Sequence, residues 1–286
     1  MAGKYDLITE LYKEISSEVS SSPQRWKEFL TCACRNFRLR FDEQLLVFAQ
    51  KPTATAVLEI ERWNKDFGRW VNRGATGIAV FADEDNSRQR ITHYFDISDT
   101  HPSNNSRPVP LWEMKPEYTN EVIDTLVSNF GALENTENLA HSVIYASRNA
   151  MEDNIPDYVG DLIHTIDDSF LAEVSDERIS QIYRKLVTGS VAYMVLSRLE
   201  LSPDQYISDE ALSDIRYFNT IETLNALGFA TSDIAEMALS EISKTVLTSC
   251  TRAGIFTRSS SGLPIVDTPQ SLDLYRKIQS NYNTDA

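Results

Sequence analysis

The sequence predicts an α+β protein, in which N-terminal helices and a small antiparallel sheet are followed by an all-α helical region. Three observations indicate this order. Apolar residues recur at helical spacing before residue 50, short segments rich in β-branched and aromatic residues follow between 69 and 97, and helical spacing returns from 116 to 250. With 286 residues, 42% of them hydrophobic, the chain can form one large or two modest domains with packed cores.

Three helices are expected before the sheet. They cover residues 5–19, 23–37 and 41–49. A run of serines ends the first, and Ser22 with Pro23 is typical of the N-cap and first turn of the second. Pro52 ends the third, because the residue before a proline disfavours the helical conformation.

The sheet is expected from short strands and tight turns. The strands cover residues 69–71, 77–81 and 91–97. Residues 54–58 fit either a strand or the entry into a helix over 59–67, which Gly68 ends. Residues 100–110 are rich in proline, serine and asparagine, which is typical of a linker.

Beyond this linker we expect helices only. They cover residues 116–130, 134–152, 156–167, 175–200, 208–216, 220–227 and 231–250. The predicted organisation is therefore an α+β domain over 1–110, an acidic all-α domain over 111–256, and a flexible tail with one short helix over 257–286.

Charge divides the chain in the same way. Residues 1–110 contain 15 basic and 15 acidic side chains, so the net charge of −15 lies entirely beyond residue 110. Within the neutral part, residues 23–80 contain 10 basic and 6 acidic side chains. A polyanion would be repelled by the second half and tolerated only by the first. No segment is apolar enough to span a membrane, and three cysteines form no disulfide framework, so a cytoplasmic location is expected.

The sequence contains little that could carry catalysis. None of its four histidines has the spacing of a zinc-protease helix, and it has neither a glycine-rich phosphate loop nor a serine nucleophile elbow. Cys32 and Cys34 would point to different sides of a helix, which disfavours a shared metal. The many carboxylates fit a solvated helical face. We expect no enzymatic activity, no metal and no cofactor.

One segment has the composition of a nucleic-acid contact. Gly68 and Gly74 permit tight turns, which would present Arg69, Trp70 and Arg73 on a short ribbon. Lys65 and Trp63 lie on the helix before it. Aromatic rings stack on unpaired bases while basic side chains follow the phosphates, so the combination suits single-stranded DNA. Alternatively, the two tryptophans are core residues and the arginines a solvated rim.

A family resemblance carries the same expectation. It rests on FDEQLLVFAQKPTATAV at 41–57 and FGRWVNRGATGIAVF at 67–81, with Trp26 and Trp63. These segments resemble the N-terminal, single-stranded-DNA-binding domain of ArdC-type antirestriction proteins. Residues 1–250 also resemble the N-terminal part of large multidomain proteins of integrative conjugative elements. Glu43 and Thr76 replace an asparagine and a lysine of the family pattern, which would weaken the hold on phosphate. The family's zinc-binding histidine pair has no counterpart.

Together these observations predict a non-enzymatic counter-defence protein of a mobile genetic element that binds single-stranded DNA. The contact residues expected are Trp63, Lys65, Arg69, Trp70 and Arg73, with Arg38, Arg40 and Lys51 as an electrostatic approach. One alternative is an acidic DNA mimic that binds a host nuclease, of a restriction or CRISPR system, through the helical half. A further alternative is a structural adaptor of the conjugation machinery.

Overall fold

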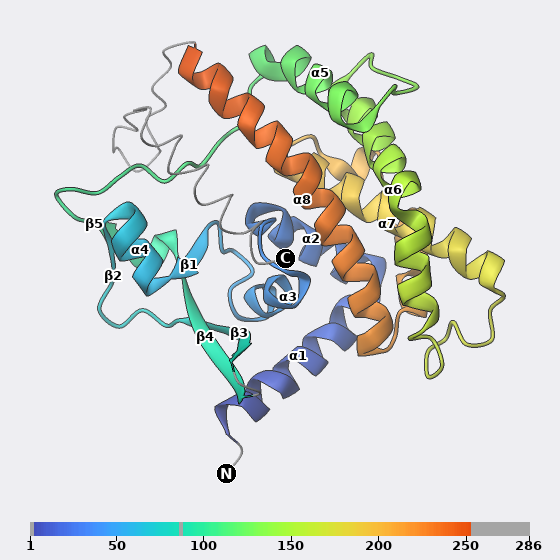
Figure 1. Cartoon of the computed structure of the whole chain (residues 1–286), viewed down its shortest axis with the longest axis horizontal. Coiled ribbons are helices and arrows are strands. Elements are labelled where there is room, and N and C mark those ends of the chain that lie inside the picture. The colour runs from blue at the N-terminus through green and yellow to red at the C-terminus, as the bar shows by residue number, and fades with distance from the viewer. Residues whose placement is uncertain (1–2, 86–87, 253–286) are drawn as a thin grey trace.

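The computed structural model describes residues 3–85 and 88–252, and it confirms the α+β fold (Figure 1). The three N-terminal helices are α1 (Lys4–Ser20), α2 (Pro23–Ala33) and α3 (Phe41–Gln50). Ser22 caps α2 as expected, its hydroxyl accepting a hydrogen bond from the Arg25 amide at 3.3 Å. Helix α2 ends earlier than predicted, because the chain tightens into a 3-10 turn, η1 (Cys34–Asn36).

Two small antiparallel sheets follow. The first has the strand order β1 (Val57–Glu59), β4 (Arg88–Asp96), β3 (Ile78–Asp85), and the second pairs β2 (Arg69–Val71) with β5 (Thr100–Pro102). Helix α4 (Ile60–Phe67) lies between β1 and β2 in the chain, and η2 (Ile97–Asp99) between β4 and β5. The predicted linker over 100–110 was therefore wrong at its start. Residues 100–102 form the strand β5, which the proline- and asparagine-rich composition did not indicate.

The described residues beyond 110 form helices and no strand, as predicted. The elements are η3 (Pro116–Tyr118), α5 (Thr119–Phe130), α6 (Leu139–Ile163), α7 (Asp176–Arg198), η4 (Pro203–Gln205), η5 (Glu210–Tyr217) and α8 (Ile221–Arg252). Figure 1 shows α8 running the length of this half beside α5, α6 and α7. None of the helices in the described part of the chain is long and apolar enough to cross a membrane.

Two expected helix breaks are absent. Helix α6 continues through Pro156, which lies on the exposed side of the helix, where water can satisfy the carbonyl that loses its partner. Helix α8 continues through Gly228. This glycine marks a close approach instead of a helix end, because a Cβ there would overlap the ring of Phe41.

The core does not follow the predicted division at residue 110. One buried cluster includes side chains of α1, α2 and α3 together with those of α6, α7 and α8. The indole of Trp26 is fully buried and donates to the Ser190 hydroxyl of α7 at 2.8 Å. Lys27 is buried as well, and its Nζ lies 2.8 Å from Asp204 and 2.6 Å from Asp209. The first three helices are thus part of the helical body.

A second, smaller buried cluster lies in the segment of the chain between α3 and α5. Trp63 and Phe67 of α4 pack there with half-buried side chains of β1, β4 and the residues after β4. This cluster supports the β2–β5 ribbon. The predicted tail over 257–286 lies outside the described residues.

Candidate nucleic-acid interface

The second cluster begins with Trp63, which the structure places inside the protein. Its side chain is fully buried, and its indole Nε1 donates to the Phe95 carbonyl at 2.7 Å. This placement differs from the predicted contact role, because a buried and hydrogen-bonded indole cannot stack on a base. Trp63 and Phe67 lie four residues apart on the inner face of α4, and their rings pack at 5.5 Å.

Trp70 has the opposite environment. It lies in the middle of β2, directly opposite His101 of β5, and 52% of its surface is exposed. His101 is also exposed, and its Nδ1 is 2.7 Å from the side-chain oxygen of Asn72. The ribbon therefore presents two rings from adjacent strands to solvent. His101 was not predicted as a contact residue, because its strand was not recognised.

Arg69 supports this ribbon from one side. Its Nε donates to the Thr100 hydroxyl at 2.8 Å and its Nη2 to the Thr100 carbonyl at 3.0 Å. Burial lowers the pKa of Arg69 from its ordinary value. The side chain thus ties β2 to β5. A phosphate bound by Arg69, as predicted, would have to compete for donors that these hydrogen bonds already use.

Two glycines shape the ends of β2, as predicted. Gly68 ends α4 with a φ of 61°, and Gly74 follows the strand with a φ of 85°. The segment after β5 packs on the first turn, where the Arg107 amide donates to the Phe67 carbonyl at 2.8 Å. The second turn carries the exposed Arg73. Arg107 and Lys65, the latter on α4, are exposed as well.

The other predicted basic residues have different surroundings. Lys51 binds Asp99 at 2.7 Å and the Ser98 hydroxyl at 3.0 Å, which ties the end of α3 to η2. Arg40 pairs with Asp42 at 3.3 Å. Arg38 packs over the Phe37 ring, 4.9 Å from its centroid. Its positive charge counteracts the effect of burial, which raises the pKa of Glu236 in α8. Lys51 thus lies beside the start of β5 with its charge paired, and the structure does not gather Arg38 and Arg40 with Trp70.

Asp96 anchors the segment that carries the ribbon. One carboxylate oxygen accepts from the amides of Thr55 and Ala56 at 2.7 and 3.0 Å, and the other from the amide and hydroxyl of Ser98 at 3.1 and 2.5 Å. Burial alone would raise the pKa of Asp96, but these hydrogen bonds outweigh it and lower the pKa. The carboxylate thereby fixes β4 against the chain before β1.

Glu43 is a structural residue as well. Its carboxylate accepts from the Arg40 amide at 3.0 Å and from the Tyr94 hydroxyl at 2.7 Å. The side chain is buried, and burial raises its pKa. Glu43 therefore lies inside the fold, where it joins α3 to β4, and not on the surface.

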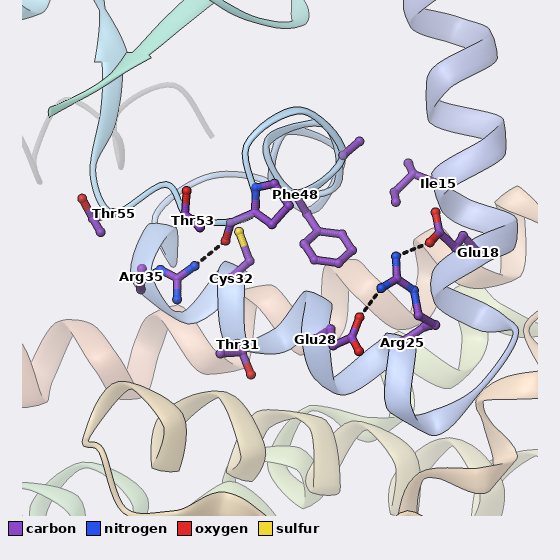
Figure 2. A pocket seen from close by; sticks show the side chains of 12 residues that line it. Ile15, Glu18, Arg25, Glu28, Thr31, Cys32, Arg35, Phe48, Thr53 and Thr55 are labelled. Carbon is purple, nitrogen blue, oxygen red and sulfur yellow. Dashed lines mark hydrogen bonds and ion pairs between the residues drawn. The ribbon is translucent and has the colours of Figure 1, made fainter. Parts of the chain in front are cut away.

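A groove lies apart from the ribbon, between α1, α2, α3 and residues 52–55 (Figure 2). Its volume is about 550 Å³. The sequence analysis did not anticipate it, because its lining comes from four segments. The residues are Ile15, Glu18, Arg25, Glu28, Thr31, Cys32, Arg35, Phe48, Ala49, Pro52, Thr53 and Thr55.

The two N-terminal cysteines are core residues. Burial raises the pKa of the Cys32 thiol to about 11 and that of the Cys34 thiol to about 12, so both are protonated at neutral pH. Within residues 3–85 and 88–252, no three histidine, cysteine or carboxylate side chains are grouped as a metal site would require.

Comparison of the chain with models of protein families, with curated proteins and with solved structures finds no match.

Proposed function

We propose that this protein binds single-stranded DNA through the β2–β5 ribbon, with Trp70 as the stacking platform. The observation that carries the proposal is the exposure of Trp70 at the centre of a ribbon whose opposite position is His101. A large apolar ring held open to water by paired strands loses little conformational entropy on stacking. The resemblance of this segment to a single-stranded-DNA-binding domain supports the same function.

The charges around the ribbon suit a phosphate backbone. Lys65, Arg73 and Arg107 are exposed, whereas two nearby acids are neutralised: Asp66 pairs with Arg62 at 3.0 Å and Asp99 with Lys51. Glu61 on α4 carries one opposing charge. Few cations are available, so binding should be weak and strongly dependent on salt.

Trp70→Ala should weaken binding of a labelled single-stranded oligonucleotide about tenfold or more, since stacking contributes roughly 1–3 kcal/mol per base. Fluorescence anisotropy at 50 mM salt measures this. Trp70→Phe should retain most of the affinity, and Phe170→Ala, which removes an exposed ring from the helical half, should leave it unchanged. Equal loss in the Trp70 and Phe170 variants would contradict a specific platform.

Arg73→Ala tests the phosphate contact separately. We expect uniformly weaker binding to all sequences and a salt dependence reduced by about one phosphate contact. The melting temperature should change little, because Arg73 is exposed. An unchanged salt slope would contradict the assignment of Arg73.

In the wider role that we propose, this binding serves a mobile genetic element by shielding its single-stranded DNA from host nucleases on entry. The protein then acts by occupancy and needs no catalytic residue. A protection assay with the full chain and a single-strand nuclease tests it, with Trp70→Ala as the control that should not protect.

An acidic surface favours a second candidate function. Residues 152–177, from the second half of α6 to the start of α7, carry nine acidic side chains and no lysine or arginine, and all nine are exposed. Phe170 stands among them with 66% of its surface exposed. Such a surface can occupy the basic cleft of a host defence nuclease. A complex with such a nuclease without DNA, abolished by Asp167→Lys with Asp168→Lys, would favour this function over the first.

A further inference from the structure

The groove between the N-terminal helices has the features of a ligand site. Its floor is α2 with the turn η1, and the residues from Arg25 to Arg35 extend about 15 Å at the helical rise. Its volume of about 550 Å³ lies within the range of small-molecule sites. Figure 2 shows Arg25 and Arg35 on opposite sides of the Phe48 ring. The groove therefore has two polar ends and an apolar middle.

The Arg35 end suits an anion. Its Nε donates to the Ala54 carbonyl at 2.9 Å and its Nη2 to the Pro52 carbonyl at 2.5 Å. These bonds fix the plane of the guanidinium but leave its charge in place, and no carboxylate among the described residues pairs with it. The exposed side chains of Thr53 and Thr55 line the same end. The Thr55 hydroxyl donates to the buried Asp96 carboxylate at 3.4 Å, so Thr53 offers the hydroxyl for a ligand. A fixed guanidinium beside a hydroxyl group is typical of phosphate recognition.

The opposite end suits a hydrogen-bond donor. There the Arg25 guanidinium pairs with both Glu18 and Glu28, so one cation meets two carboxylates and the end carries a net negative charge. Carboxylates accept hydrogen bonds only. Between the two ends, the Phe48 ring and Ile15 offer an apolar wall against which a flat body can lie.

We propose that this groove binds a nucleoside monophosphate. The phosphate lies at Arg35 and Thr53, the base lies against Phe48, and an amino group of the base donates to Glu28. A plain aromatic carboxylate would satisfy the Arg35 end but leave the carboxylate end without a partner. The site is distinct from the ribbon and does not depend on DNA binding there.

Isothermal titration of the full chain with dAMP, dCMP, dTMP and inorganic phosphate tests the proposal. We expect saturable binding of dAMP and dCMP, weaker binding of dTMP, whose base has no amino group, and at least tenfold weaker binding of phosphate alone. Absence of saturable binding by any nucleotide would overturn the proposal. Phosphate binding as tightly as dAMP would also overturn it, since the groove would then recognise an anion only.

Two variants locate the binding. Thr31→Trp places an indole in the groove and should weaken dAMP binding at least tenfold, whereas Lys13→Trp, at an exposed position of α1 outside the groove lining, should not. Thr53→Glu, which places a carboxylate at the phosphate end, should have the same effect as Thr31→Trp. Unchanged affinity in both groove variants would overturn the assignment.

A 5′-phosphorylated oligonucleotide distinguishes the source of the nucleotide. If it competes with dAMP, the groove takes the end of a strand, and if it does not, the groove takes a free nucleotide. Both results support the proposed chemistry. Oligonucleotide binding that depends on Trp70 should persist in Thr31→Trp, so the ribbon and the groove can fail independently.

Discussion

Replacing Gly228 by alanine should destabilise the protein by about 3 kcal/mol, as overpacking of a closed core does. The new methyl group would overlap the ring of Phe41. That ring is fully buried and cannot retreat, because Trp26, Phe29 and Phe229 surround it at 5.6 to 6.4 Å between centroids. Chemical denaturation of the full chain measures the loss.

Gly160→Ala is the matched control. Gly160 also lies within a helix, α6, but an added Cβ would meet no atom within 4 Å. Alanine there should stabilise the protein by about 0.5–1 kcal/mol through its helix propensity. If Gly228→Ala were equally stabilising, α3 and α8 would not pack as described. Phe41→Leu should restore part of the stability lost in Gly228→Ala.

Asp96→Asn should also destabilise the protein by about 3 kcal/mol at neutral pH. An asparagine offers one acceptor oxygen in place of two, so its amide group would face either the Thr55 and Ala56 amides or the Ser98 donors. The donors left unsatisfied are at the buried end of β4. Asp99→Asn, which removes only a partly exposed pair with Lys51, should cost about 1 kcal/mol or less.

The Asp96 effect should depend on pH in a defined direction. Because the folded protein lowers the pKa of Asp96, the ionised carboxylate stabilises the fold above the pKa of the unfolded chain. This stabilisation is lost as the pH falls below about 4 toward the folded pKa. The difference in unfolding free energy between wild type and Asp96→Asn should therefore shrink in acid. A constant difference down to pH 2 would contradict the role of the charge.

The two tryptophans of the predicted contact surface show which part of the candidate site could be predicted from the sequence. Trp63 and Trp70 have similar basic neighbours, so composition left both open between a contact surface and the core, and the family resemblance favoured the surface for both. The helical spacing of Trp63 and Phe67 was a signal for burial, since residues four apart share a face. No such spacing covers Trp70, which lies in a three-residue strand.

Other features depended on partners far away in the chain. Strand β5 is defined by its pairing with β2, and three residues carry too little pattern to reveal it. Gly228 resembled a helix end until Phe41 was placed against it. Lys27 contributes to the basic excess counted over residues 23–80, whereas in the structure it is buried and binds Asp204 and Asp209. Periodicity predicted the helices because it is local, but long-range contacts decide which charges and rings remain available.

Tryptophan fluorescence during titration with single-stranded DNA tests the central claim most directly. Of the four tryptophans, Trp26, Trp63 and Trp112 are at most 5% exposed, and Trp70 is 52% exposed. Stacking of a base on Trp70 should quench part of the emission at low salt, and the quenching should be absent in Trp70→Phe. Emission that stays constant while the oligonucleotide binds, or quenching that persists in Trp70→Phe, would contradict DNA binding through the ribbon.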